Sequence, residues 1–158
     1  MERANDEARY RARFYLDPND FDTGEALAHR RTRIFIGFEE SPNRRLIAIV
    51  LRRISGAYAL AGRTRLDDNS QADTGFFPIT GAPHFVELRW ERATAPLAND
   101  GLFELWIDDA LMASLTGLDN DTRAVDFVRM GGLSLKAAAS GTLFFDAFES
   151  RRETHIGP

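Results

Sequence analysis

The sequence predicts an all-β fold made of two stacked antiparallel sheets, and three observations lead to it. Short runs of alternating apolar and polar residues recur along the chain, as in strands with one buried face. Gly, Pro, Asn and Asp, the residues that form turns, separate these runs. No segment has the periodicity of an amphipathic helix of ordinary length. About nine or ten short strands of this kind are typical of a two-sheet β-sandwich such as a jelly roll.

Four strands are predicted in the first half of the chain. Residues 10–16 alternate apolar side chains mainly with arginine, and Pro18 ends the run because it has no amide proton for a sheet ladder. Residues 32–39 are rich in β-branched and aromatic side chains, which favour strands. Residues 45–53 are continuously apolar in their middle, which indicates a strand covered on both faces. Residues 57–65 follow a Ser-Gly turn.

The second half begins with a predicted long loop, residues 66–83, which is rich in Asp, Asn, Ser, Gly and Pro. Loops of this length are often functional or loosely ordered. The first strand after it carries Val86, Leu88 and Trp90 on one side, so we expect Trp90 in the core. The remaining runs of strand-forming residues, each bounded by turn residues, complete the sandwich: 84–92, 102–108, 110–116, 125–131 and 141–149.

Length and composition fit one domain with a sizeable core. The 158 residues are 44% hydrophobic and include 12 Phe. A chain of this length can bury about 70% of its unfolded surface. We therefore expect a single domain over 1–158, with the sandwich at about 8–152 and polar tails at both ends.

Charge and residue content argue against several classes of function. The net charge of −4 makes nucleic acid an unfavourable partner, because affinity for it comes largely from Lys and Arg. The arginines occur in scattered pairs balanced by acids, which we interpret as an ordinary soluble surface. The absence of Cys excludes disulfides and thiolate metal sites. No apolar stretch is long enough to insert into a membrane, and no signal peptide is present, so the chain is either intracellular or a domain of a longer exported protein.

Residues typical of catalysis do not form recognisable patterns. The three histidines, at positions 29, 84 and 155, are far apart and lack metal-binding spacing, and no G-x-S-x-G motif occurs. Glu104 and Asp108 would lie about 13 Å apart along one strand, too far for either mechanism of glycoside hydrolysis. We therefore predict that the protein is not an enzyme.

Trp106 is the strongest candidate for contact with a ligand. It lies between Glu104 and Asp108 on one face of a strand whose other face looks like core. Sugars stack on flat aromatic rings flanked by polar groups. The alternative is that Trp106 packs in a second layer. We predict a glycan-binding site formed by Trp106, Glu104 and Asp108, with Tyr58 as a weaker member.

Asp146 is the candidate for a metal ligand, because it interrupts the apolar strand at 141–149. A buried carboxylate needs a partner, and a calcium ion is one way to supply it. The alternatives are that Asp146 faces solvent on an edge or pairs with an arginine. The Asp119–Asp121 segment begins like a calcium-binding EF-hand loop, but Thr122 and Arg123 break the pattern. We predict a structural Ca²⁺ at Asp146.

Four stretches of the chain resemble bacterial members of the laminin-G-like or concanavalin A-like jelly rolls, over about residues 8 to 152. ELWIDDALMASL looks like the hairpin of that group, and GTLFFDAFES like its closing strand. YRARFYLDPN and HFVELRW look like versions found on large exported proteins. The resemblance implies two sheets, one of them concave, and often a structural calcium. Asp146 matches the first acid of the closing pattern, while Ala147 stands where a second Asp often occurs.

The resemblance also implies a class of function. Members are commonly carbohydrate-binding or protein-binding modules. Catalytic members carry a Glu-x-Asp-x-Glu or Glu-x-Asp-x-x-Glu run on a central strand, where this chain has FELWIDD. We therefore predict a non-catalytic carbohydrate-binding or adhesion module of a secreted or cell-surface bacterial protein, as part of a longer exported chain. Its expected partner is a glycan or a neighbouring protein domain. The alternatives are a structural or assembly domain that packs against other proteins, and a glycan-cleaving enzyme.

Overall fold

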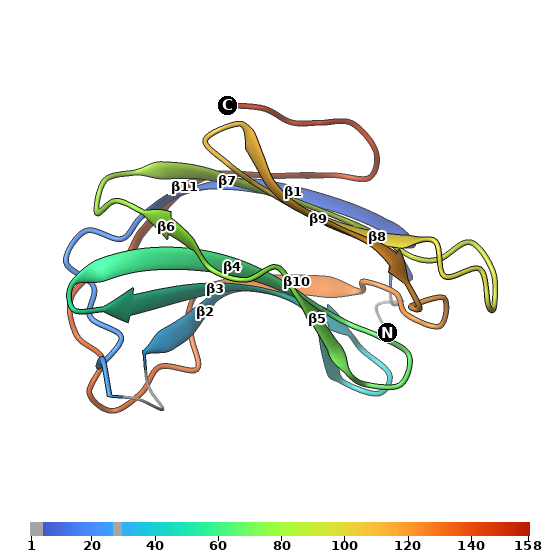
Figure 1. Ribbon diagram of the computed structural model, residues 1–158, viewed down its shortest axis with the longest axis horizontal. Helices are drawn as coiled ribbons and strands as arrows, with labels where there is room; N and C mark the ends of the chain where they lie inside the picture. Colours follow the sequence, from blue (N-terminus) through green and yellow to red (C-terminus); the bar gives the residue numbers. More distant parts are fainter. Residues whose placement is uncertain (1–4, 27–29) are drawn as a thin grey trace.

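The computed structural model describes residues 5–26 and 30–158, and within those ranges it contains strands and no helix. Eleven strands form two antiparallel sheets, as predicted (Figure 1). The five-stranded sheet has the order β11-β1-β7-β8-β9, and the six-stranded sheet has the order β10-β2-β3-β4-β5, with β6 also paired to β4. Their bounds are β1 (Arg9–Asp17), β2 (Arg31–Glu39), β3 (Arg44–Ile54), β4 (Ala57–Arg65), β5 (Gln71–Asp73), β6 (Phe77–Ile79), β7 (His84–Glu91), β8 (Gly101–Ile107), β9 (Ala110–Leu118), β10 (Phe127–Leu133) and β11 (Phe144–Arg151).

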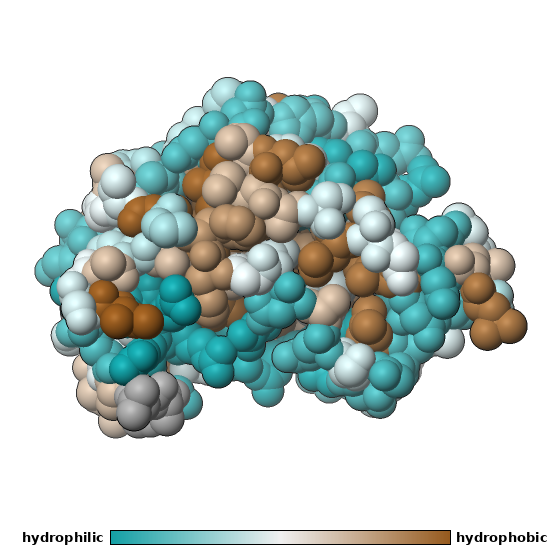
Figure 2. Space-filling view, viewed as in Figure 1, coloured by the Kyte–Doolittle hydropathy of each residue, from teal (hydrophilic) through white to brown (hydrophobic). Residues whose placement is uncertain are grey.

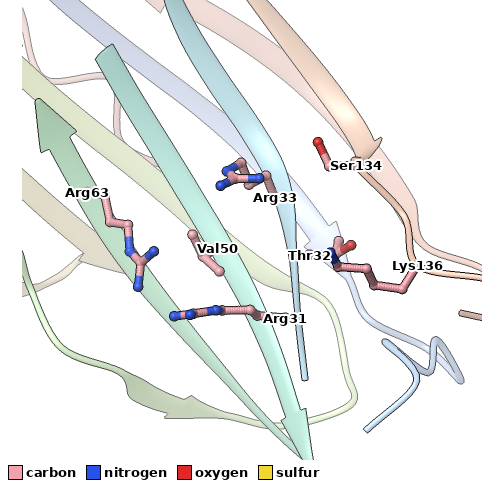
Figure 3. Close-up of a pocket in the computed structure, with 7 residues that line it drawn as sticks. All are labelled: Arg31, Thr32, Arg33, Val50, Arg63, Ser134 and Lys136. Carbon is pink, nitrogen blue, oxygen red and sulfur yellow. The ribbon is translucent and has the colours of Figure 1, made fainter. Parts of the chain in front are cut away.

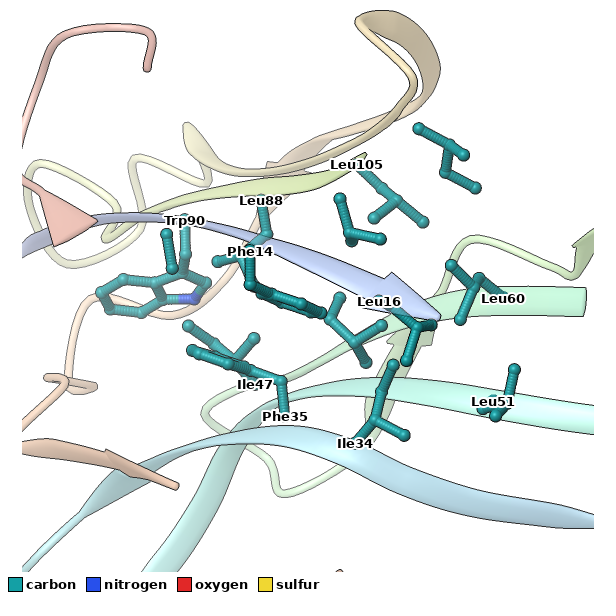
Figure 4. Packing of buried hydrophobic residues seen from close by; sticks show 14 of the residues in the cluster. Phe14, Leu16, Ile34, Phe35, Ile47, Leu51, Leu60, Leu88, Trp90 and Leu105 are labelled. Atoms are coloured by element: carbon teal, nitrogen blue, oxygen red, sulfur yellow. The ribbon is translucent and has the colours of Figure 1, made fainter. Parts of the chain in front are cut away.

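One hydrophobic cluster fills the space between the two sheets (Figure 4). The rings of Phe14 on β1 and Phe35 on β2 stack across it, with centroids 5.9 Å apart. Trp90 is fully buried, as predicted, and its indole Nε1 donates to Thr64 Oγ1 at 3.0 Å. The alternation seen in the sequence therefore corresponds to real burial, because apolar side chains of both sheets point into a shared interior.

The segment 66–83 was predicted as a long loop, and this is wrong in part. It contains β5 and β6, two three-residue strands that pair side by side with different halves of β4. Such short edge strands are difficult to recognise in a sequence, because three residues cannot establish an alternating pattern. On this side of the molecule, apolar side chains lie between the two sheets (Figure 2). Phe77 and Ile79 of β6 and Met112 and Leu115 of β9 are partly buried and pack against the core.

The two sheets are bent in the same direction, so that the outer face of the six-stranded sheet lies inside the curve (Figure 1). The C-terminal tail crosses the outer face of the five-stranded sheet instead (Figure 1). There the main-chain amides of Ile156 and Gly157 both donate to the carboxylate of Glu87, at 3.2 Å. Within the described ranges, no helix is long and apolar enough to cross a membrane.

Candidate functional site

The two outer faces of the sandwich differ in how their charges are compensated. On the five-stranded sheet, arginines and acids alternate and pair. Arg11 lies 2.6 Å from Glu87, and Arg89 lies 2.6 Å from Glu91. Arg89 also contacts Glu104 at 3.2 Å. Charges that neutralise one another in this way leave little net field for attracting a charged ligand.

The outer face of the six-stranded sheet carries arginines from three neighbouring strands, and we call it the arginine groove. It is formed by Arg31 and Arg33 of β2, Arg45 and Arg52 of β3, and Arg63 and Arg65 of β4, with Lys136 from the segment after β10. Figure 3 shows Arg31, Arg33 and Arg63 around Val50, with Lys136 on the far side of β2. Across the strands, Arg31 is in register with Arg52. Like charges placed directly opposite one another weaken a sheet, which suggests that this face is arranged for binding rather than for stability.

Two identical Arg-Thr-Arg triplets, residues 31–33 and 63–65, supply four of these arginines. The central Thr32 and Thr64 are 3% and 1% exposed. Because side chains alternate between the two faces of a strand, burying the threonine turns both flanking arginines outward. This was the available sequence signal for the groove. The expectation that the arginines are scattered and balanced by acids is wrong for this face.

The floor of the arginine groove consists of small side chains. Ala48 and Val50 of β3 and Ala61 of β4 point outward between the arginines, and all three are buried. The prediction that the strand at 45–53 is covered on both faces in its middle is therefore confirmed, because the side chains there are buried on either face. The outer cover is the long arginine side chains on either side, not another layer of the fold. Small floor residues leave a hollow that larger ones would fill.

Three hollows follow one another along the groove and share arginines. Arg31, Arg52 and Phe76 line the first, and the guanidinium of Arg52 lies 3.9 Å from the centre of the Phe76 ring. Arg31, Arg33 and Arg63 line the second, together with Lys136. The third is lined by polar side chains on both sides of Ala48, namely Arg33, Arg45, Arg63, Arg65 and Gln71. Shared walls make the three hollows one continuous groove.

The positive charge in the groove is largely uncompensated. Burial lowers the pKa of Arg33 below its usual range, and the neighbouring Arg45, Arg63 and Arg31 lower it further. Arg63 is paired with Asp73 at 2.6 Å. In the described part of the chain, no carboxylate lies within ion-pair distance of the groove's other five arginines. An anion that entered the groove would therefore find guanidinium groups ready to donate paired hydrogen bonds.

The residues predicted to bind a glycan lie outside the arginine groove, and two of the four, Glu104 and Trp106, share the outer face of β8. Trp106 is half-buried on the five-stranded sheet, under Arg11 and beside the His155 ring, with centroids 5.8 Å apart. Glu104 is paired with Arg89. Asp108 lies outside the strand, in the turn after β8, and contacts His84 at 2.7 Å.

Tyr58, the fourth predicted ligand-binding residue, is 7% exposed and belongs to the core cluster. Its hydroxyl donates to the carbonyl oxygen of Phe21 at 2.8 Å. Burial raises its pKa above the usual value for tyrosine. In this position the ring packs between the sheets and presents no face to a sugar. His29 lies outside the described residues.

Asp146, the predicted calcium ligand, is exposed on the edge strand β11. Its carboxylate accepts a hydrogen bond from the amide of Ala147, at a position where β11 bulges away from β1. Among the described residues, the carboxylates that could share a cation are those of Asp67, Asp119 and Asp121, whose oxygens lie within 4.8 Å of one another. Asp146 is not part of that group.

The three clustered carboxylates predict a measurable effect on stability. The pKa of Asp121 is raised above 3.8, first by partial desolvation and then by repulsion from Asp67 and Asp119. A raised pKa means that the ionised form is disfavoured in the fold, so ionisation costs stability above that pKa. Asp121→Asn is therefore expected to raise the melting temperature at neutral pH. The gain should shrink as the pH falls toward the acidic limit of the fold. Thermal melts of both proteins across that range check it, and a loss of stability at neutral pH would contradict it.

Comparison with known proteins gives matches in structure alone. No protein-family model and no curated protein matches the sequence. An endo-β-1,4-glucuronan lyase from the fungus Trichoderma reesei aligns with a TM-score of 0.63 and 15% identity, over 92% of this chain and 68% of that one. The alginate lyase Aly36B aligns with a TM-score of 0.63 and 14% identity, over 94% and 72%. The receptor-binding domain of botulinum neurotoxin type G aligns at 0.60 and 9% identity, over 93% of this chain and 36% of that one.

These similarities confirm the jelly-roll sandwich and correct the functional prediction. Two of the three structures are polysaccharide lyases, which contradicts both the non-catalytic binding or adhesion module and the statement that the chain is not an enzyme. That prediction rested on the absence of nucleophile, histidine and paired-carboxylate patterns, and the paired carboxylates serve only hydrolysis among the ways of cleaving a glycan. At this level of identity the likeness establishes the fold: the chain is a two-sheet jelly roll similar to polysaccharide lyases.

Proposed function

We propose that the protein is a glycan-cleaving enzyme that acts on an acidic polysaccharide bound in the arginine groove. The observation that carries this proposal is the row of guanidinium groups, paired with a carboxylate only at Arg63 among the described residues, on the inside of the sheet's curve. Glucuronan and alginate are polymers of uronic acids, with one carboxylate on each sugar. A guanidinium donates two parallel hydrogen bonds to a carboxylate, so a row of arginines suits a ligand with regularly spaced carboxylates.

The extent of the groove supports a polymer over a small ligand. Arg52 and Arg45 are seven residues apart on β3, a distance of roughly 20 Å along the strand. Three connected hollows lie within this distance, each with at least two arginines. A single uronic acid would occupy one hollow, whereas an oligomer would engage all three and gain from linked binding. Affinity is therefore expected to rise with oligomer length.

The chemistry that fits the groove is β-elimination. In this reaction a proton is removed from the sugar carbon next to the carboxylate, and a double bond forms between that carbon and the adjacent ring carbon. The bond from that adjacent carbon to the glycosidic oxygen breaks, and the oxygen takes up a proton and leaves as a hydroxyl. Negative charge builds up on the carboxylate as the proton leaves, so Arg33 and Arg63 would bind the transition state more strongly than the substrate. Lys136 lines the same hollow, and we assign it to proton transfer. A laminin-G-like or concanavalin A-like relationship and an extracellular location belong to the same proposal, since polysaccharides of this kind lie outside cells.

The test is incubation of the purified protein with glucuronan, with alginate and with a neutral glucan as control. Elimination creates an unsaturated uronic acid, whose ultraviolet absorbance reports cleavage, while a reducing-end assay reports any break in the chain. We expect both signals to rise with at least one acidic polymer and neither with the neutral one. New reducing ends without the absorbance would indicate hydrolysis and refute elimination. No cleavage of either acidic polymer would contradict the proposal.

A further inference from the structure

Outside the arginine groove, three side chains form a relay in the order hydroxyl, imidazole and carboxylate. The hydroxyl Oγ1 of Thr80 lies 2.8 Å from Nε2 of His84, and Nδ1 of His84 lies 2.7 Å from Oδ2 of Asp108. Thr80 follows β6, His84 begins β7, and Asp108 lies in the turn after β8. The relay therefore joins the ends of strands from both sheets. None of its residues has a role in the proposed glycan cleavage.

The hydrogen bonds fix the state of the imidazole ring. A carboxylate only accepts hydrogen bonds, so the close contact with Asp108 places a proton on Nδ1. Nε2 accepts from the main-chain amide of Thr80 at 3.0 Å, so it carries no proton, and its one lone pair is shared between that amide and the Thr80 hydroxyl at 2.8 Å. The second oxygen of Asp108 accepts from the amide of Phe85 at 3.0 Å, which holds the carboxylate in place. This is the tautomer that a general base needs.

We propose that Thr80, His84 and Asp108 form a nucleophilic site that hydrolyses acyl esters. Thr80 is the nucleophile, His84 the base, and Asp108 the group that orients the base. Thr80 is exposed and open to a substrate, while His84 is 9% exposed and shielded from water. The amide of Ala82 donates to Thr80 Oγ1 at 3.2 Å, which fixes the position of the hydroxyl oxygen beside His84.

An apolar hollow beside the same loop suits the acyl group of such a substrate. Pro83, which directly precedes His84, lines it together with Tyr15, Phe144 and Phe145. Phe144 is 54% exposed, which is a large exposed fraction for an apolar side chain of this size. Asp17 and Asp146 complete the lining, and their negative charges disfavour a free carboxylate as ligand. An uncharged ester with a small apolar acyl group matches these surroundings.

The reaction balances without any added group. Thr80 Oγ1 attacks the ester carbonyl carbon, and its proton passes to Nε2 of His84. The bond from the carbonyl carbon to the alcohol oxygen breaks, and that oxygen takes the proton from His84 as the alcohol leaves. Water then attacks the acyl-threonine with His84 again as base. Acid is released and the Thr80 hydroxyl is restored.

The test uses the whole chain with p-nitrophenyl acetate as substrate and a fluorophosphonate as covalent probe. We expect turnover by the wild-type protein, a loss of about a thousandfold or more in Thr80→Val and in Asp108→Asn, and retention in Thr80→Ser. The probe should label the peptide that contains Thr80. Circular dichroism melts establish that each variant is folded.

Thr94→Val is the matched control. The Thr94 hydroxyl donates directly to the carboxylate of Asp100 at 2.7 Å in an exposed turn. Thr80 differs in that its hydroxyl contacts a histidine, which in turn contacts the carboxylate. The ester hydrolysis of Thr94→Val should equal that of the wild type. The proposal is wrong if the wild-type protein neither hydrolyses the ester nor takes the label, or if folded Thr80→Val retains wild-type turnover.

Discussion

Arg33→Gln is expected to remove most of the cleavage of acidic polysaccharide and, at the same time, to raise the melting temperature. Arg33 lines both the second and the third hollow of the arginine groove, so its loss weakens contacts to two sugars. A hydrogen bond to a charged group contributes about 1.5–3 kcal/mol, which predicts roughly a tenfold to hundredfold loss for each carboxylate contact. Activity assays with the preferred acidic polymer measure the first effect, and thermal melts measure the second.

The rise in stability follows from the sign of the electrostatics. Burial and three neighbouring arginines lower the pKa of Arg33, so its positive charge is disfavoured in the folded protein. Glutamine keeps the polar character of the side chain and removes that charge. For the same reason, an acidic polymer is expected to raise the melting temperature of the wild-type protein more than that of the variant. Binding and stability should therefore change in opposite directions.

Arg89→Gln is the matched control, because it removes an arginine from the five-stranded sheet whose neighbours are carboxylates and not other arginines. Burial alone would lower the pKa of Arg89, but Glu91 and Glu104 raise it above the usual range. Its loss should lower the melting temperature and leave cleavage unchanged. If Arg33→Gln cleaves the polymer as well as the wild type, the arginine groove is not the site of cleavage. If it lowers stability as Arg89→Gln does, the electrostatic account of the groove is wrong.

The strands could be predicted from the sequence because burial of one face of a strand produces an alternation of apolar and polar residues along the chain. Each residue of β1 or β7 points in or out according to its own place in the alternation. The arginine groove produces no such pattern, since Arg33 and Arg63 are 30 residues apart and meet only because β3 lies between β2 and β4. The paired Arg-Thr-Arg triplets show which face the arginines share on each strand. Which strands are neighbours is a tertiary property that spacing does not reveal.

The prediction for Asp108 was wrong because of the local conformation of the chain. The sequence predicts a strand over 102–108, in which Asp108 would share a face with Trp106 and Glu104. The strand ends instead at Ile107, and Asp108 and Asp109 both adopt positive φ angles, of 52° and 65°, in a tight turn. Two consecutive residues of this conformation are typical of a type I′ hairpin, for which Asp is well suited. The turn directs the Asp108 carboxylate back to β7, where it contacts His84.

Arg11→Met is expected to destabilise the fold by about 3–5 kcal/mol, the cost of leaving a buried charge without its partner. The Glu87 carboxylate is 0% exposed and lies 2.6 Å from Arg11, whose side chain is 7% exposed. The other contacts of the Glu87 carboxylate are His155 at 3.1 Å and the amides of Ile156 and Gly157, all from the C-terminal tail. Because the tail is what covers Glu87, water can reach the carboxylate only if the tail lifts. We therefore expect faster proteolysis of the tail in the variant.

Two further variants separate burial from charge in this interaction. Arg11→Met combined with Glu87→Gln should recover much of the lost stability, because a neutral amide can accept from the tail amides without a buried charge. Arg9→Met removes the arginine two residues earlier on the same strand, where its ion pair with Glu153 is exposed, and should change the melting point little. Urea unfolding of the four proteins gives the free energies. Equal losses of stability in Arg9→Met and Arg11→Met would show that the tail does not seal Glu87 from water. If the double variant is no more stable than Arg11→Met alone, the Arg11 guanidinium acts through its packing against Trp106 and not through its charge.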